Sequence, residues 1–256
     1  MMIQLPEFSH TPIDIHSHFN HGSPYDTPQT QAHIRDFDYV KAGYDRFGIY
    51  YAGMSTFASV VYHPECIVEE NEYLHDLVQK TDWMYQWVVM DPRQPETFRQ
   101  AEQMLPDKKV LGIKIHPTYH DYDILELGDE LFAFAAEHKT MVLMHPQHIT
   151  EMHQLTDKYP DMKLMIAHLT SEEYIEGAKK AKHGNIYVDT SARGVALNHI
   201  LEYAVEQLGS EKILFGTDTY APSFSLPRVA LADIPYEDKE NILFKNALRL
   251  FPNAFR

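Results

Sequence analysis

Short apolar runs, many of them rich in β-branched residues, alternate along the chain with longer stretches in which apolar positions recur at helical spacing. The short runs predict buried β-strands, and the longer stretches predict amphipathic helices between them. Eight strands are predicted, over residues 12–18, 48–56, 84–90, 110–116, 140–145, 163–168, 185–191 and 212–218. The helical stretch "DFDYVKAGYDRFG" should end at Gly48. Ser171 should cap another helix, with Glu172 and Glu173 in its first turn.

Eight strands that alternate with helices, at a repeat of about 30 residues, match a (β/α)8 TIM barrel in count and in total length. A doubly wound open sheet is the alternative, but it usually carries a glycine-rich phosphate turn after its first strand, and "HSHFNHGSP" is not such a turn. No linker or low-complexity tract divides the chain, so we expect residues 1–256 to form one α/β barrel domain. Residues 19–33 form the longest irregular stretch and are a candidate lid over the active face.

The composition is that of an ordinary globular protein, with 44% hydrophobic and 23% charged residues. The net charge of -15 argues against a nucleic-acid partner. The one cysteine, Cys66, excludes an internal disulfide or a thiolate metal cluster and should be a buried small residue. No apolar run approaches the roughly 20 residues of a membrane span, and the first residues do not form a signal peptide. We therefore expect a cytoplasmic enzyme with a small-molecule substrate and no membrane partner. A homo-oligomer is compatible with the sequence.

The first predicted strand, within "IDIHSHFNHG", carries two closely spaced histidines. Side chains alternate between the faces of a strand, so Asp14, His16 and His18 should share one face. Two imidazoles held side by side can share a metal ion, although they could also form the polar edge of an ordinary sheet.

Further candidate residues lie where the other predicted strands end. Active sites of (β/α)8 barrels gather at the C-terminal ends of the strands. Five of the predicted strands end in a histidine or an aspartate, namely His18, His116, His145, His168 and Asp218. Any one of these could be an ordinary hydrogen-bonded side chain, but five at one level of one barrel indicate a functional site.

Imidazole and carboxylate groups are the ligands of catalytic zinc, manganese and ferrous iron, which keep one coordination position open for water. A bound divalent ion can lower the pKa of that water from 15.7 to about 7. A neighbouring aspartate can then accept the proton, and a histidine can orient the water or act as the acid.

Several motifs follow one another in a recognisable order. They are "DIHSH" (14–18), "GIKIHP" (112–117), "VLMHP" (142–146), "LMIAHL" (164–169), "YVDTS" (187–191), "ILFGTD" (213–218) and the closing "NILFKNALRLF" (241–251). With these motifs the chain resembles the amidohydrolase superfamily over nearly its whole length. It is most similar to the amidohydrolase-related (amidohydrolase 2) group of metal-dependent hydrolases and nonoxidative decarboxylases.

This resemblance implies one divalent metal ion, with zinc as the first expectation and manganese or iron as alternatives. The implied ligands are His16, His18, His145 and Asp218, and Asp218 would also accept a proton. His168 would lie beside the metal-bound water or the scissile group of the substrate, or would bind a second metal.

The roles of the other candidates are less defined by the resemblance. Lys114 and His116 share a face of their strand. In binuclear relatives a lysine on this strand is carboxylated and bridges two metals. Because His116 crowds the same face, we expect a mononuclear site in which Lys114 is uncarboxylated and both side chains face substrate. Arg193 could bind a substrate carboxylate or be a solvated loop residue, and Asp189 should orient a neighbour or cap a turn. Three histidines in strand-end loops could also contact substrate: His21, His120 and His148.

The favoured function is a metal-dependent hydrolase that uses a metal-activated water to cleave a small-molecule amide, ester or lactone. A nonoxidative decarboxylase of a small carboxylic acid is the alternative, since it would use the same metal ligands. Two other families fit the sequence less well. TatD-like nucleases carry a glutamate on the fourth strand, where "LGIKIHP" has none. Phosphoesterases of the polymerase-and-histidinol-phosphatase type end their last strand with an Asp-x-His pair, whereas this chain has "GTDTYAP". A noncatalytic ligand-binding barrel would not need both Asp218 and His168. The identity of the substrate does not follow from the sequence.

Overall fold

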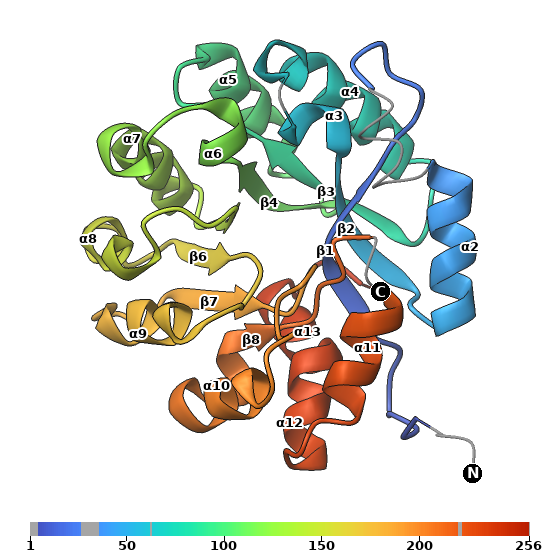
Figure 1. Ribbon diagram of the computed structural model, residues 1–256. Helices are drawn as coiled ribbons and strands as arrows, with labels where there is room; N and C mark the ends of the chain where they lie inside the picture. The colour runs from blue at the N-terminus through green and yellow to red at the C-terminus, as the bar shows by residue number, and fades with distance from the viewer. Residues whose placement is uncertain (1–4, 27–35, 62, 220–221, 256) are drawn as a thin grey trace.

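The barrel is seen in a computed structural model that describes residues 5–26, 36–61, 63–219 and 222–255 (Figure 1). Eight parallel strands form one sheet in sequence order. They are β1 (Ile13–Phe19), β2 (Tyr51–Thr56), β3 (Met84–Val89), β4 (Val110–Ile115), β5 (Met141–Met144), β6 (Lys163–Ile166), β7 (Ile186–Asp189) and β8 (Ile213–Leu214). The two edges meet where Ile15 N donates to Phe215 O and Asp218 N donates to His16 O. The predicted (β/α)8 barrel is therefore confirmed.

Helices surround the strands on the outside of the barrel (Figure 1). The α-helices are α2 (Phe37–Phe47), α3 (Phe57–Val60), α4 (Ile67–Val78), α5 (Pro95–Met104), α6 (Pro117–His120), α7 (Ile124–Glu137), α8 (His153–Thr156), α9 (Glu172–Lys180), α10 (Ile200–Leu208), α11 (Pro222–Ala230), α12 (Tyr236–Glu240) and α13 (Asn246–Leu250). Short 3-10 helices cover Pro64–Cys66, Ile149–Glu151 and Ser210–Lys212, and a π-helix covers Asn241–Lys245. No helix in the described part of the chain is long and apolar enough to cross a membrane.

The ends of two helices can be compared with the sequence predictions. Helix α2 ends at Gly48, as predicted, and this residue has a φ of 69°, which glycine adopts without strain. Ser171 precedes α9 in an extended conformation, and Glu172 and Glu173 lie in the first turn. Ser171 is the N-cap residue of α9, as predicted, but its side chain makes no capping hydrogen bond.

The interior of the barrel is filled with apolar side chains below the site. Trp87 is fully buried, and its Nε1 donates to Ile15 O at 2.7 Å. Gly112 makes room for the indole, since a Cβ at this position would lie 2.9 Å from Trp87 Cζ3 and 2.3 Å from Met141 O. Cys66 is buried, as predicted. The core closes the centre of the barrel, and a cavity lined by polar side chains lies where these follow the strand ends.

The first strand differs from the simple alternation that the sequence predicted. Its register with β2 shifts between Asp14 and Ser17. The Asp14 carboxylate accepts hydrogen bonds of 2.6 Å from the hydroxyls of Ser17 and Tyr44, and it accepts another from Thr217 N. Burial raises the pKa of Asp14 to about 6, although these hydrogen bonds oppose the rise. The prediction that Asp14 shares a face with the strand-one histidines is wrong, because its carboxylate turns toward α2 instead.

Candidate metal centre

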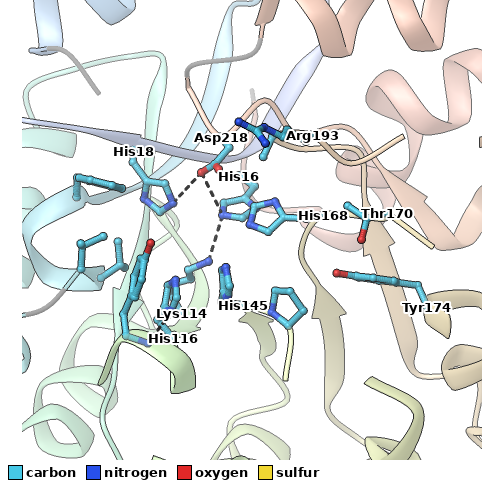
Figure 2. Close-up of a pocket in the computed structure, with 16 residues that line it drawn as sticks. His16, His18, Lys114, His116, His145, His168, Thr170, Tyr174, Arg193 and Asp218 are labelled. Atoms are coloured by element: carbon cyan, nitrogen blue, oxygen red, sulfur yellow. Dashed lines mark hydrogen bonds and ion pairs between the residues drawn. The ribbon is translucent and has the colours of Figure 1, made fainter. Parts of the chain in front are cut away.

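A cavity of about 420 Å³ lies at the C-terminal ends of the strands (Figure 2). Eight of the residues to which the sequence assigned a role line it. These are His16, His18, Lys114, His116, His145, His168, Arg193 and Asp218. The remaining lining consists of Phe57, Val60, Val61, Tyr119, Pro146, Thr170, Tyr174 and Ala192, which sequence reasoning did not single out. These residues lie in loops or first helical turns, where no periodic pattern marks the direction of a side chain.

His16, His18 and Asp218 converge on one point of the cavity. Asp218 Oδ1 lies 3.2 Å from His18 Nε2 and 3.9 Å from His16 Nε2. The two imidazole rings are nearly perpendicular, with centroids 5.2 Å apart. Asp218 has a φ of 55°, a strained value for a residue other than glycine, and the bond from its N to His16 O holds it there. One ligand atom from each of the three residues therefore lies within 4.8 Å of the other two.

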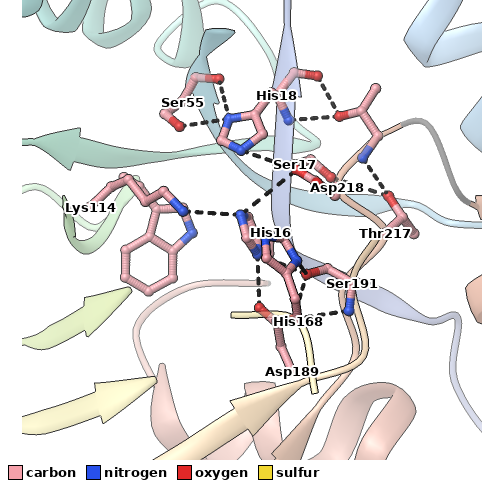
Figure 3. Close-up of polar contacts among 12 residues, drawn as sticks. His16, Ser17, His18, Ser55, Lys114, His168, Asp189, Ser191, Thr217 and Asp218 are labelled. Atoms are coloured by element: carbon pink, nitrogen blue, oxygen red, sulfur yellow. Dashed lines mark hydrogen bonds and ion pairs between the residues drawn. The ribbon is translucent and has the colours of Figure 1, made fainter. Parts of the chain in front are cut away.

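The opposite nitrogen of each strand-one histidine is held by a hydrogen-bond partner (Figure 3). His16 Nδ1 lies 2.8 Å from Asp189 Oδ2, and His18 Nδ1 lies 2.9 Å from Ser55 Oγ. Such partners fix the ring orientation and leave Nε2 as the nitrogen that faces Asp218 and Lys114 in the cavity. The contact of Asp189 is the one expected for a residue that orients a neighbour. Ser55 was missed, because its place beside His18 comes from the register between β1 and β2 in the folded sheet, which neither strand's own sequence shows.

Asp189 also holds His168 in place. Asp189 Oδ1 accepts hydrogen bonds of 2.9 Å from the backbone N–H groups of His168 and Ser191. His168 Nδ1 lies 2.8 Å from Ser191 Oγ, and the His168 ring stacks on that of His16 with a centroid distance of 5.1 Å. His168 has a φ of 66°. The carboxylate of Asp189 thus positions the two stacked histidines together.

The electrostatics favour the protonation states that metal binding requires. Burial, together with the nearby charge of Lys114, lowers the pKa of His16 to about 3. Burial likewise lowers the pKa of His145 to about 2. Burial would raise the pKa of the Asp218 carboxyl, but its hydrogen bond with His18 and the nearby histidines bring it below its usual range. Neutral imidazoles beside an ionised carboxylate are a donor set that suits a divalent transition metal.

His145, the fourth predicted ligand, lies in the same cavity but is not part of the converging group. Its ring stacks on His116, with a centroid distance of 3.8 Å, and lies 5.3 Å from the ring of His168. The Nδ1 atom of His145 is buried without a hydrogen-bond partner in the described part of the protein. A buried ring nitrogen without a partner is consistent with a missing ligand, and the role of His145 as a metal ligand stays a prediction.

Lys114 and His116 both face the cavity, as the alternation on β4 predicts. Lys114 is 1% exposed, and its Nζ lies 3.1 Å from His16 Nε2. Burial lowers the pKa of Lys114 to about 8, against the opposing charges of two aspartates. His116 Nδ1 accepts a hydrogen bond of 3.2 Å from Tyr119 N and so caps α6. Arg193 is exposed and makes no ion pair within the described residues.

The three loop histidines do not line the cavity. His21 Nε2 lies 2.8 Å from a Glu70 oxygen, and His148 Nε2 lies 2.8 Å from an Asp123 oxygen. His120 Nε2 lies 3.0 Å from Ser59 O. These three side chains therefore have structural partners instead of the substrate contacts that were considered. Of the candidate lid, residues 20–26 do not line the cavity, and residues 27–33 lie outside the described residues.

Comparisons with solved structures show the same fold at low sequence identity. The dihydroxybenzoic acid decarboxylase from Polaromonas sp. JS666, with bound manganese and the inhibitor 2-nitroresorcinol, is 16% identical with a TM-score of 0.73, over 94% of this chain and 97% of that chain. The 5-carboxyvanillate decarboxylase from Novosphingobium aromaticivorans DSM 12444, complexed with manganese and 4-hydroxy-3-methoxy-5-nitrobenzoic acid, is 16% identical with a TM-score of 0.74, over 95% and 96%. A 2,6-dihydroxybenzoate decarboxylase complexed with 2,6-dihydroxybenzoate is 14% identical with a TM-score of 0.73, over 94% and 99%.

The family comparison covers almost the whole barrel. No curated protein matches the chain significantly. A family model described as amidohydrolase matches residues 13–252, from the start of β1 to just beyond α13. This range includes every residue of the cavity. The chain therefore belongs to the amidohydrolase family of metal-dependent enzymes.

Proposed function

We propose that the protein is a metal-dependent nonoxidative decarboxylase of a small aromatic carboxylic acid. The observation that carries this proposal is the convergence of His16, His18 and Asp218 in a cavity of about 420 Å³. The sequence favoured a hydrolase, with decarboxylation as the alternative. Three similar structures are decarboxylases of aromatic acids, so they support the alternative better.

The proposed metal ligands are His16, His18 and Asp218, with His145 as the fourth. Their neutral nitrogens and one carboxylate oxygen suit zinc, manganese or iron. Manganese is bound in two of the similar structures, whereas zinc remains the prediction from the sequence. A divalent ion held there would fix the substrate and polarise one of its oxygens as a Lewis acid.

Decarboxylation requires one proton for each molecule of CO₂ that leaves. The bond between the ring carbon and the carboxyl carbon breaks, and its electron pair stays on the ring carbon, where it forms a new C–H bond. An anion R–COO⁻ and one H⁺ thus become R–H and CO₂. We assign delivery of this proton to Asp218, because its carboxylate faces the cavity. Since the pKa of Asp218 lies below its usual range, it would hold the proton only briefly before passing it to the ring carbon.

The other polar residues of the cavity would position the substrate. His168 Nδ1 contacts Ser191 Oγ, and the opposite ring nitrogen, Nε2, would hydrogen-bond an oxygen of the substrate. Lys114 would place a positive charge near the anionic substrate, and Arg193 would bind a carboxylate at the exposed side of the cavity. Phe57 and Val60 would pack against the ring.

The test is to load the protein with Mn²⁺ or Zn²⁺ and to measure CO₂ release from a panel of hydroxybenzoates and carboxylated hydroxybenzoates. We expect release that a chelator abolishes and added metal restores. The variant Asp218→Asn is the matched negative control, because it keeps the size of the side chain. A parallel panel of lactones, esters and amides tests the hydrolase. Metal-dependent hydrolysis without CO₂ release from any acid would replace the decarboxylase by the function that the sequence favoured.

A further inference from the structure

The carboxylate of Asp14 is fully buried on β1 and does not line the cavity. Five hydrogen-bond donors surround it. Oδ2 accepts from the hydroxyls of Ser17 and Tyr44, both at 2.6 Å, and from the hydroxyl of Thr217. Oδ1 accepts from two backbone N–H groups, that of His16 at 3.0 Å and that of Thr217 at 3.1 Å. One carboxylate therefore joins β1 to the segment that follows β8.

The segment after β8 has a conformation that needs such support. Asp218 and Thr219 have φ values of 55° and 63°, and two consecutive left-handed residues other than glycine are strained. Strain of this kind persists only where the surrounding contacts determine the conformation. Thr217 provides one of these contacts, because its Oγ1 accepts from Thr219 N at 3.0 Å while its hydroxyl donates to Asp14. Asp14 thus supports the turn that carries the proposed ligand Asp218.

The same turn is bonded to the backbone of the two histidines on β1 (Figure 3). Asp218 N donates to His16 O at 2.8 Å, and His18 N donates to Thr219 Oγ1 at 2.6 Å. The Thr219 hydroxyl in turn donates to His18 O. Because Asp14 also accepts from His16 N, loss of its carboxylate would loosen both strand segments that carry the proposed metal ligands.

We propose that Asp14 is a positioning residue for the metal centre, which holds His16 and Asp218 at the separation that one metal ion requires. Asp14 contacts neither the metal nor the substrate. The inference rests on the proposed function only for the identity of the metal ligands, and not for the reaction that the metal supports.

The experiment measures the dissociation constant of Mn²⁺, by titration of metal-free protein in competition with a chelator. Asp14→Ala leaves both backbone N–H groups without an acceptor. Asp14→Asn keeps Oδ1 for these groups, and the three hydroxyls can turn to accept from its NH₂ group. Both variants remove the negative charge, so the difference between them reports the hydrogen bonds alone. The dissociation constant of Asp14→Ala should be at least 10-fold above that of Asp14→Asn.

Tyr44→Phe is the control for a purely structural role. It removes the hydrogen bond from α2 to the same carboxylate and leaves Oδ1 bonded to both strand segments. Tyr44→Phe should therefore unfold more easily than wild type but bind Mn²⁺ within twofold of it. The visible absorption spectrum of Co²⁺-loaded protein reports the geometry of the metal ligands. This spectrum should change in Asp14→Ala and stay as in wild type in Tyr44→Phe.

A second pair of variants keeps the test valid if Asp14→Ala folds poorly. Thr217→Val removes the hydroxyl that contacts both Asp14 and Thr219 N, whereas Thr217→Ser keeps it. The dissociation constant should be at least fivefold higher for Thr217→Val than for Thr217→Ser. Equal constants within the Asp14 pair would overturn the proposal, as would equal constants within the Thr217 pair where Asp14→Ala does not fold. An equal rise in Asp14→Ala and Tyr44→Phe would also overturn it.

The outcome is separable from that of the proposed function. If the variants show the expected differences in Mn²⁺ binding but wild type releases CO₂ from no acid, Asp14 keeps its positioning role and decarboxylation falls. If wild type releases CO₂ and the Asp14 variants bind Mn²⁺ alike, the positioning role falls alone. A wild type that binds neither Mn²⁺ nor Co²⁺ would overturn both.

Discussion

Replacing Asp189 with asparagine should weaken metal binding, although Asp189 itself is not proposed to touch the metal. Asp189 Oδ1 accepts from two backbone N–H groups, so the amide oxygen of the variant must take that place. The amide nitrogen then faces His16 Nδ1, where Oδ2 now lies at 2.8 Å. An amide N–H donates to Nδ1 and therefore places the ring proton on Nε2. A protonated Nε2 cannot bind a metal ion.

The expected rise in the dissociation constant of the metal follows from the hydrogen bond that the variant loses when the metal binds. Metal binding requires a neutral His16 whose Nε2 carries no proton. The ring proton must then sit on Nδ1, where in the variant it would face the N–H group of the asparagine. The Asp189 carboxylate is fully buried, and a hydrogen bond to a charged group contributes about 1.5–3 kcal/mol. At about 1.4 kcal/mol for each factor of ten, the dissociation constant of the metal should rise about 10- to 100-fold. Removal of partners that orient metal ligands costs a similar factor elsewhere.

The assay is a titration of metal-free protein with Mn²⁺, in competition with a chelator of known affinity. Asp91→Asn is the matched control, because Asp91 is another fully buried aspartate that follows a strand. Its partner is Arg93, at 2.6 Å, which does not line the cavity. Asp91→Asn should lower the free energy of unfolding and leave the metal affinity unchanged. Asp189→Asn with a wild-type dissociation constant would refute the proposed orientation of His16.

Further outcomes are expected at the site and at the surface. His18→Ala should purify with little metal, and elemental analysis that finds wild-type content would contradict its role as a ligand. Asp218→Asn should lose most of its turnover even in samples that retain metal. His168→Asn should keep its metal and lose about 100- to 1000-fold in turnover, so near-normal turnover at full metal content would remove it from the mechanism. The hydrogen bonds from Arg228 lower the pKa of Glu202 to about 2 from 4.5. Because the pKa of Glu202 is lower in the folded state than in the unfolded state, its ion pair with Arg228 stabilises the fold fully above about pH 4.5. This stabilisation is lost as the pH falls toward 2. Glu202→Gln should cost about 1–2 kcal/mol of unfolding free energy at pH 7, discounted for partial exposure, and almost nothing near pH 2, as denaturant melts at both pH values would show.

Local patterns in the sequence determined which strands form, although β6, β7 and β8 end at Ile166, Asp189 and Leu214, earlier than the predicted ends at residues 168, 191 and 218. Apolar runs of strand length recur with helical stretches between them. Each predicted strand overlaps an observed one and contains it, except that β1 extends one residue beyond the predicted end, to Phe19. Parallel strands in a barrel place their C-terminal ends at one level, so residues at those ends could be grouped without coordinates. This is why His16, His18 and Asp218 could be predicted to meet, and the structure brings them within ligand distance of one another.

Asp14 shows where local pattern fails. Strict alternation placed it with the two histidines of its strand, but the register shift turns its carboxylate toward Tyr44 and Thr217. These partners are 30 and 203 positions away along the chain. A bulge that depends on hydrogen bonds with such distant partners leaves no periodic signal in the strand itself.

Tertiary structure alone decided the contacts that make the site selective. Ser55 faces His18 and Asp189 faces His16 because neighbouring strands, and the two edges of the closed barrel, bring these residues together. The buried, unpartnered Nδ1 of His145 likewise depends on how the chain after β5 folds against its neighbours. The periodicity of a sequence shows which face of a helix or strand is buried. The hydrogen-bond partner of a polar atom depends instead on closure of the whole barrel, so these partners could be found only in the folded protein.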